Sequence, residues 1–296
     1  MKKILLESMK AWVEHRASSK GAALAFYTLF SMTPILMLAI AIVGFFFGTQ
    51  AAQGEIIGQI RGLVGPNGAE AIQALIAAAR NPASGLVATL TALVLLFVGA
   101  TSVFSELKDS LDEMWGVAPH PQSALVGLIK ARFLSFSLVL VLAFLLLISL
   151  VISAALAVLE KYVSGIWSNS VWLLSALSSV VTFSAIASLF AVIYKMLPEA
   201  PLSWRDVWIG AVFTALFFSL GKYLIGLYLG NSGVASSFGA AGSLIALLLW
   251  VYYSAQIFFF GAEFTRQYAL WYGSLQHERH RQMVQSEKKS SAAVEF

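Results

Sequence analysis

Long runs of apolar residues, broken by short polar segments, follow one another along almost the whole chain. A run of about 20 residues in a helix crosses a hydrocarbon core of about 30 Å. Runs of sufficient length cover residues 21–48, 85–104, 133–159, 171–194, 204–230 and 239–264. The pattern therefore predicts an all-α, polytopic membrane protein with six transmembrane helices.

Two further stretches have the spacing of amphipathic helices. In residues 1–20 the apolar positions predict one interfacial helix that lies on the membrane. In residues 50–80 they predict two short amphipathic helices on the opposite surface, separated by the break at Gly65 and Pro66. The apolar positions are Ile4, Leu5, Met9, Trp12 and Val13 in the first stretch and Ile56, Ile57, Ile60, Leu63, Val64, Ile72, Leu75, Ile76 and Ala79 in the second.

The composition agrees with this class of protein. Of the 296 residues, 59% are hydrophobic and 11% are charged, against roughly 25% charged in soluble domains. No polar block is long enough for a separate soluble domain. The predicted organisation is an interfacial helix at 1–20, a membrane domain at 21–265 that includes the amphipathic helices at 50–80, and a polar tail at 266–296. Because there is no cysteine, disulfides and thiolate metal ligands are excluded.

The basic residues are unevenly divided between the two sides of a six-span arrangement. All but Arg61, Arg80, Lys161 and Lys222 of the 19 Lys and Arg residues lie in the first segment, the second and fourth loops and the tail. By the positive-inside rule, both termini are predicted to be cytoplasmic and the helices at 50–80 periplasmic. The same rule accounts for the net charge of +4, so nucleic acid is not expected as a partner.

Lys222 is the basic residue that lies well inside an apolar run. A cation at membrane depth either faces a polar cavity or extends its side chain to the membrane surface. Lys222 lies about 24 Å along a helix from Asp206, at ~1.5 Å per residue, which is within reach of the outer surface. Two interpretations stay open: an anion-binding site with Ser219 and Tyr223 beside it, or a side chain that reaches the outer headgroups.

On the sixth run, Tyr252, Gln256 and Glu263 fall on a single helical face. Tyr252 and Gln256 are candidates for binding a substrate, and a plain hydrogen bond between helices is the alternative for Gln256. Glu263 is a candidate for proton coupling, and an ion pair with Arg266 or another basic loop residue is the alternative.

Four more residues are candidates for gating. Pro34 removes a backbone donor and predicts a kink in the first span. Lys108, Asp109 and Asp112 belong to a charged segment just beyond the second span. This segment predicts either a cytoplasmic gate or simply a solvated charged helix.

The sequence contains little that points to catalysis. There is no G-x-x-x-x-G-K-[ST] segment, so ATP use through a P-loop is not expected. The histidines are His15, His120, His277 and His280, and no set of them with carboxylates predicts a metal site. We therefore expect no catalytic residue, no metal and no cofactor, and a protein that is not an enzyme.

Several segments, in order along the chain, resemble the YihY/BrkB family of bacterial inner-membrane proteins, once labelled ribonuclease BN. One departure is Asp112, where the family often has Asn. The resemblance implies six spans and a location in the bacterial cytoplasmic membrane, and the residues lend no support to a ribonuclease. The matching segments are AFYTLFSMTP at 25–34, FSELKDSLDEMWGV at 104–117, YKMLP at 194–198, GKYLIGLYLG at 221–230, GAAGS at 239–243, WVYYSAQ at 250–256 and GAEFT at 261–265.

These features predict a protein that translocates a lipid or another anionic amphiphile of the cell envelope without its own ATPase. An ion- or proton-coupled transporter of small solutes is one alternative. A scaffold for envelope assembly that transports nothing is the other. The expected partners are membrane lipids, with a second copy of the chain or envelope proteins as further possibilities.

Overall fold

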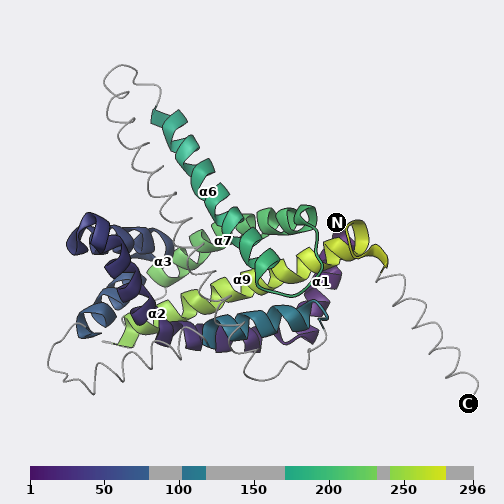
Figure 1. Cartoon of the computed structure of the whole chain (residues 1–296), viewed down its shortest axis with the longest axis horizontal. Helices are drawn as coiled ribbons and strands as arrows, with labels where there is room; N and C mark the ends of the chain where they lie inside the picture. The colour runs from purple at the N-terminus through teal and green to yellow at the C-terminus, as the bar shows by residue number, and fades with distance from the viewer. Residues whose placement is uncertain (80–101, 118–170, 232–240, 278–296) are drawn as a thin grey trace, which may run out of the picture.

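The computed structural model describes residues 1–79, 102–117, 171–231 and 241–277. Within these residues the secondary structure is helical, without β-strands, which confirms the predicted all-α class. An unlabelled helix covers 102–114. The labelled helices in Figure 1 are α1 (Lys2–Glu14), α2 (Ala17–Phe47), α3 (Thr49–Ala79), α6 (Val171–Met196), α7 (Trp204–Asn231) and α9 (Gly242–Tyr272).

Among the described helices, three contain a segment that is long and apolar enough to cross a membrane, namely Ser179–Met196, Trp204–Leu229 and Gly242–Tyr272. They correspond to the fourth, fifth and sixth predicted spans. α2 covers the first predicted span and continues through Pro34, whose side chain lies outside the described part. Residues 133–159 and nearly all of 85–104 also lie outside it, so the count of six spans stays a prediction.

α7 and α9 cross through a pair of matching contacts. Each helix has a glycine followed four residues later by a threonine, and each threonine hydroxyl donates to the carbonyl oxygen of its own glycine. A methyl group placed on Gly210 would lie 1.8 Å from Thr265 Oγ1, and one on Gly261 would lie 2.0 Å from Thr214 Oγ1. Small residues allow this close approach of helices, so the two glycines fix the spacing between α7 and α9.

Tyr194 joins α6 to the same crossing. Its side chain is fully buried, and its hydroxyl donates to the carbonyl oxygen of Phe258 at 2.7 Å. Thr214 Oγ1 lies 3.2 Å from the same hydroxyl. Phe190, Phe258 and Trp115 surround the ring. The buried residues around Tyr194 form the core in which α6, α7, α9 and the helix at 102–114 meet.

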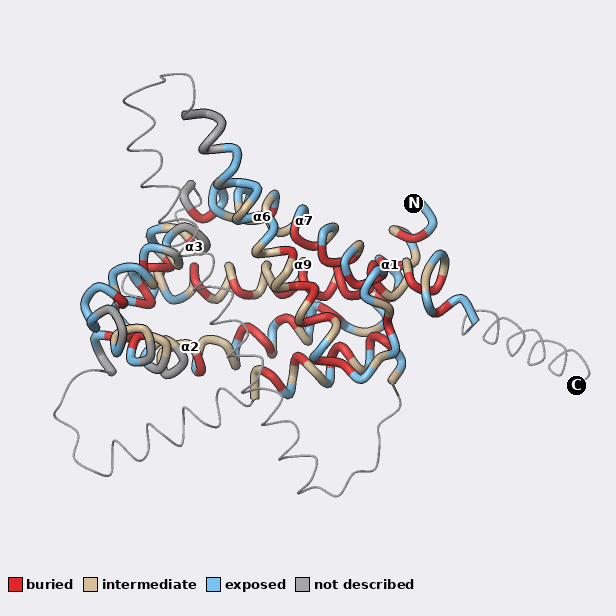
Figure 2. The backbone as a smooth tube through the Cα atoms, turned by 45° about the horizontal axis from the view of Figure 1, so that its top comes forward, coloured by how far each residue is buried: buried red, intermediate tan, exposed pale blue. Residues whose placement is uncertain are grey.

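α2, α3 and α9 share a second core at the other end of the molecule, as the buried residues in Figure 2 show. α3 is interrupted at Gly65, which has φ 79° and ψ 177°, so the predicted break between two helices is confirmed. Ile57, Val64, Ile72 and Ile76 are buried against α2 and α9. The apolar faces of α3 therefore pack on neighbouring helices in addition to any contact with lipid.

The apolar residues of α1 lie on two faces of the helix. Ile4 is buried together with Ser8 and Ala11 where α1 packs on α9, whereas Met9 and Val13 point away. The small side chains of Ser8 and Ala11 permit close packing, which a hydropathy pattern does not register. α1 consequently has one face on the protein and a second, apolar face that is exposed.

Candidate functional site

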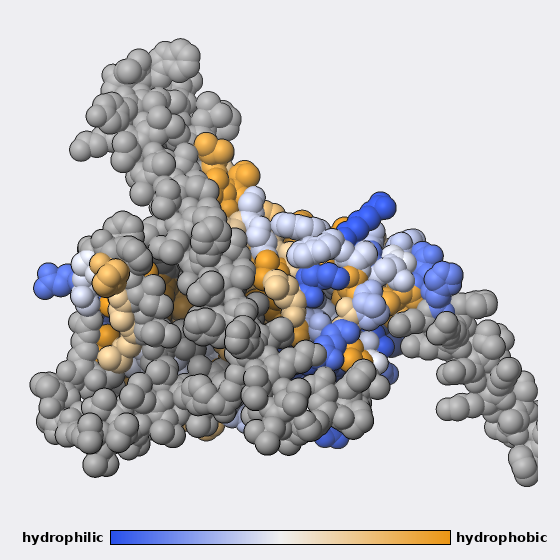
Figure 3. Space-filling view, in the orientation of Figure 1, coloured by the Kyte–Doolittle hydropathy of each residue, from blue (hydrophilic) through white to orange (hydrophobic). Residues whose placement is uncertain are grey.

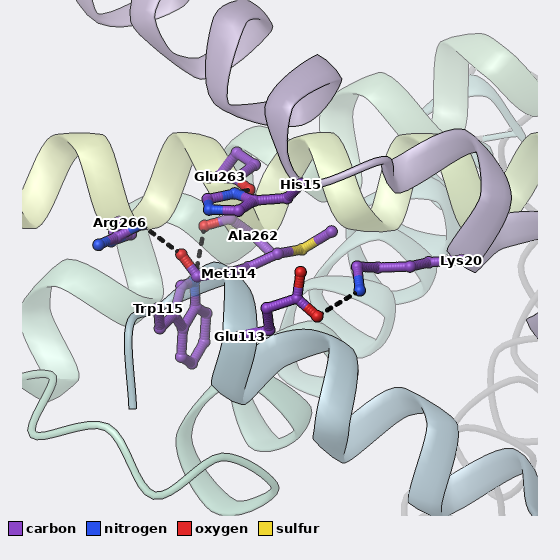
Figure 4. A network of polar contacts seen from close by, with 8 residues as sticks. All are labelled: His15, Lys20, Glu113, Met114, Trp115, Ala262, Glu263 and Arg266. Atoms are coloured by element: carbon purple, nitrogen blue, oxygen red, sulfur yellow. Dashed lines mark hydrogen bonds and ion pairs between the residues drawn. The ribbon is translucent and has the colours of Figure 1, made fainter. Parts of the chain in front are cut away.

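A buried carboxylate, Glu263, lies on α9 where α1 and α2 pack against it. Its side chain has 0% exposure, and Oε1 lies 2.6 Å from Nδ1 of His15. His15 is the residue that ends α1, and the following Arg16 has a left-handed backbone (φ 50°) that turns the chain into α2. The turn thus aims the imidazole at the carboxylate (Figure 4).

The second carboxylate oxygen, Oε2, is also buried, and it has no hydrogen-bond partner among the described residues. Leaving a buried acceptor unpaired costs about 1 to 3 kcal/mol relative to a satisfied one. Most buried polar groups in proteins have partners, so an exception calls for an explanation. The free oxygen is therefore available to a proton or to a hydrogen-bond donor that is not part of the described chain.

The segment 113–116 closes the other side of this site. Trp115 donates its indole N–H to the carbonyl oxygen of Ala262 at 3.0 Å, and Arg266 Nη1 donates to the carbonyl oxygen of Met114 at 2.6 Å. A cation at the C-terminus of a helix stabilises its free carbonyl groups. Gly116 has φ 71°, and a methyl group there would come within 3.0 Å of Arg266 Nη2. Arg266 is thus committed to capping the helix at 102–114.

The hydrogen-bond partner of Glu263 is therefore His15. It is not Arg266, which the sequence suggested as a possible ion-pair partner. The hydrogen bond to Glu263 raises the pKa of His15 above its ordinary 6.5, and partial burial of the imidazole offsets only part of this rise. The charge of Arg266 lowers the same pKa, and that of Glu113 raises it. Nearby, Lys20 Nζ donates to Glu113 Oε2 at 2.7 Å and ties α2 to the helix at 102–114.

The charged segment beyond the second span makes a separate contact. Lys108 pairs with Asp112, and Lys108 Nζ lies 3.7 Å from Glu199 Oε1. Asp112 Oδ1 accepts a hydrogen bond from the backbone N–H of Glu199 at 2.9 Å, while Asp109 is exposed. Burial by itself would lower the pKa of Lys108, but the bond to Asp112 and the surrounding acidic charges raise it. Lys108 and Asp112 thus join the helix at 102–114 to the loop between α6 and α7.

The residues proposed around Lys222 lie on α7, away from Glu263. Tyr223 is 65% exposed, and Lys222 and Ser219 are half-buried. On the same helix Trp208 and Tyr228 are also exposed. They are about 30 Å apart at ~1.5 Å per residue, the thickness of a hydrocarbon core, and aromatic residues favour the membrane boundaries. If Trp208 and Tyr228 mark the two membrane boundaries, Lys222 lies six residues from the boundary at Tyr228. This depth favours an amine that reaches that boundary.

Gln256 and Tyr252 face a different helix from Lys222. Gln256 lies against α2, where a methyl group on Gly21 would be 2.0 Å from its Nε2, and neither polar atom of the amide has a partner in the described part. Tyr252 is half-buried beside the core shared by α2, α3 and α9. By contrast Gly221, the neighbour of Lys222, contacts Tyr253 and Ile257. The structure therefore separates the proposed substrate-binding set into two places.

The predicted shared face of α9 is present in the structure. Its polar residues Gln256 and Glu263 face α2 and the end of α1, respectively. The sequence predicts Glu263 and Gln256 as candidate site residues, but it does not point to His15 or the indole of Trp115. His15 ends an amphipathic helix, which is a weak signal, and nothing in the spacing connects it to residue 263. Within the described ranges, no three His, Asp or Glu side chains gather as metal ligands.

Comparison with known proteins places the chain in a family of membrane proteins. A model of the family described as "Virulence factor BrkB" matches residues 8–286. A "UPF0761 membrane protein" of Verminephrobacter eiseniae is 28% identical over 83% of this chain and 57% of its own length. One from Actinobacillus pleuropneumoniae is 25% identical over 87% of this chain and 90% of its own length. One from Pseudomonas aeruginosa is 28% identical over 85% of this chain and 59% of its own length.

This chain thus spans little more than half of two of these three relatives. No solved structure matches it. The shared descriptions and the apolar helices make it an integral membrane protein. Since the family model covers nearly the whole chain, the protein belongs to the BrkB family.

Proposed function

We propose that this protein is a membrane transporter in which Glu263 and His15 couple movement of a solute to protons. The supporting observation is the state of Glu263, a buried carboxylate with one oxygen on a titratable imidazole and the other without a hydrogen-bond partner in the described part of the chain. Ionisable residues inside membrane segments are costly and often mark proton or ion pathways. Under this proposal the chain is not an enzyme and uses no cofactor.

The pair has the chemistry that proton exchange requires. An imidazole titrates near neutral pH, and its donor and acceptor nitrogens allow it to pass a proton between two sides. His15 keeps 24% of its side-chain exposure, whereas Glu263 has none. A proton can therefore reach His15 from water and then Glu263 through the 2.6 Å contact. Gln256 lies further along the same face and offers the next hydrogen-bonding group.

Proton flux into vesicles tests the proposal. Purified protein is reconstituted with a pH-sensitive dye inside, and a potassium diffusion potential drives protons inward in the presence of a panel of small solutes. We expect wild-type protein to raise the flux and Glu263→Gln to remove the increase. Glu113→Gln is the matched control, because Glu113 belongs to the same region but is 58% exposed. Equal flux in wild-type and Glu263→Gln vesicles would contradict the proposal.

A second function rests on Lys222, a half-buried cation between exposed apolar side chains of α7 such as Leu220, Tyr223 and Leu224. In this alternative the protein translocates a lipid or another anionic amphiphile, whose headgroup the ammonium attracts. Scrambling of a fluorescent anionic lipid would then fail in Lys222→Ala and survive in Lys222→Arg. If neither flux nor scrambling occurs and an envelope protein copurifies, a scaffold role replaces both.

We also propose a location and partners for the protein. The distribution of basic residues supports the bacterial cytoplasmic membrane as the location, with both termini in the cytoplasm. The polar networks around His15, Lys108 and Asp206 would then lie at the cytoplasmic side. Membrane lipids are the proposed partners, and a second copy of the chain is a further one.

A further inference from the structure

α1 presents an apolar face that packs on nothing else in the described part of the chain. Leu6, Met9 and Val13 are 63%, 53% and 62% exposed, respectively. They recur at i, i+3 and i+7, so they form one stripe along the helix. The opposite face, with Ile4, Ser8 and Ala11, is buried on α9. We call the exposed stripe of Leu6, Met9 and Val13 the outer face of α1.

Basic residues border this outer face. Lys2 precedes Leu6 by four residues and so continues the stripe, and Lys3 and Lys10, seven residues apart, follow one of its edges. All three are exposed. Of the two acidic residues on α1, Glu7 accepts a hydrogen bond from the indole of Trp271. An exposed apolar stripe with lysines along it has the pattern of a helix that lies in a membrane interface.

The position of α1 brings the outer face to the membrane. Glu7 contacts Trp271 and His15 contacts Glu263, so α1 packs on the last turns of α9, which it crosses obliquely in Figures 1 and 4. At ~1.5 Å per residue α9 is about 46 Å long, which exceeds a hydrocarbon core of about 30 Å. The end of α9 beside α1 also carries Tyr268 and Tyr272, of which Tyr272 is 60% exposed. Most of the hydrophilic surface visible in Figure 3 gathers over the same end.

We propose that the outer face of α1 docks on the surface of the bilayer and that its lysines bind anionic phospholipid headgroups. The occupant is a membrane, because the helix is held beside the end of a span and its apolar stripe has a basic border. Each Lys near an anionic surface strengthens such attachment. The attraction decays with distance from the surface over about one Debye length. This inference is independent of the proposed transport activity.

The absence of cysteine permits a direct test with single labels on the full chain. Met9→Cys, labelled with an environment-sensitive fluorophore, is compared with Glu14→Cys, an exposed position on another side of α1. Both proteins are placed in nanodiscs of phosphatidylcholine with or without phosphatidylglycerol. With phosphatidylglycerol, the label at position 9 should shift to the blue and be quenched by spin-labelled lipid. The label at position 14 should stay accessible to iodide.

Two outcomes would overturn the proposal. If iodide quenches the label at position 9 as strongly as that at position 14 in both kinds of nanodisc, the outer face is not docked. If the label is shielded equally in detergent and the particle has doubled mass, a second copy covers the face in place of lipid. The triple variant K2Q/K3Q/K10Q tests the headgroup contact, since it should lose the dependence on phosphatidylglycerol, and an unchanged dependence would contradict the role of the lysines.

Discussion

Two buried carboxylates of this protein differ in how they are satisfied. Asp206, 2% exposed in the first turn of α7, accepts hydrogen bonds from the backbone N–H and the hydroxyl of Ser274, at 2.8 Å and 2.7 Å. Glu263 has one contact, to an imidazole, and one oxygen without a partner among the described residues. A carboxylate held by groups that do not titrate stabilises the fold, whereas one held by a titratable group can exchange a proton.

The local chemistry explains why Asp206 serves structure. It follows Ser203, whose hydroxyl accepts the backbone N–H of Asp206 and caps α7, as the S-x-x-D spacing indicates. An acidic side chain in the first turn also interacts favourably with the helix dipole. A methyl group on Gly273 would lie 2.3 Å from Asp206 Oδ1, so the end of α9 is shaped around this carboxylate.

The largest effect is expected where α7 and α9 pack closely on each other. Gly261→Ala should lower the free energy of unfolding by about 3 kcal/mol, because overpacking a tight contact costs up to that amount, and its methyl group would meet Thr214 Oγ1 and Tyr194 OH. Unfolding in mixed detergent micelles measures the change. Gly226→Ala on α7 is the control, because no atom of the described residues lies within 4 Å of the added methyl group. Equal effects of the two substitutions would refute the packing argument.

Replacing the structural carboxylate should have the next largest effect on stability and none on proton exchange. Asp206→Ala leaves the N–H and hydroxyl of Ser274 without their acceptor, at a cost of about 2 kcal/mol. The same unfolding experiment measures this loss. Proton flux per folded molecule should stay at the wild-type level, and a selective loss of flux would show that Asp206 also takes part in transport.

Glu263→Gln should have the opposite pattern, with a small loss of stability and a large loss of proton flux. The amide preserves the volume of the side chain and keeps a hydrogen bond to His15, so we expect a loss of only about 1 kcal/mol in stability. The flux should nevertheless fall to that of empty vesicles, because an amide does not carry a proton at neutral pH. A loss of stability larger than that of Asp206→Ala would assign Glu263 a mainly structural role.

The contribution of His15 to stability should depend on pH. Because its folded-state pKa is raised above the unfolded value of 6.5, the stabilisation is present in full below about pH 6.5 and is lost as the pH rises through the folded-state pKa. The groups facing the imidazole are Glu263, Arg266 and Glu113. The difference in melting temperature between wild type and His15→Asn should therefore shrink as the pH is raised from 6 to 9. A difference that does not change with pH would exclude this linkage.

The smallest effect on stability is expected at Lys222. Lys222→Gln should change the free energy of unfolding by less than about 0.5 kcal/mol, as substitutions away from buried networks usually do. Its proton flux should equal that of the wild type. A strong loss of flux in this variant would extend the functional region from α9 to α7.

The helices could be predicted from sequence, because hydropathy and helical spacing are local properties. The break at Gly65, the start of α7 at Trp204 and the shared face of Gln256 and Glu263 all follow from spacing. The pairing of His15 with Glu263 could not be predicted, since it joins residues 248 positions apart. Likewise GAVFT at 210–214 and GAEFT at 261–265 are visible as similar segments, but their mutual contact depends on how the helices pack.

Lys222 and Glu263 show how little residue type alone says about a candidate site. A lone cation in an apolar run stands out in the letters, while a glutamate near the end of a span does not. The structure gives Lys222 a half-buried place on α7 and gives Glu263 complete burial. Depth and partners, which the sequence does not contain, distinguish the two.

The titration of His15 in the intact protein tests the buried pair most directly. Magnetic resonance of isotope-labelled histidine rings follows each imidazole, and the signal that disappears in His15→Asn identifies this one. The account predicts that this signal titrates above pH 6.5 in the wild type and at a lower pH in Glu263→Gln, which removes the charged partner. The same midpoint in both proteins would contradict the account.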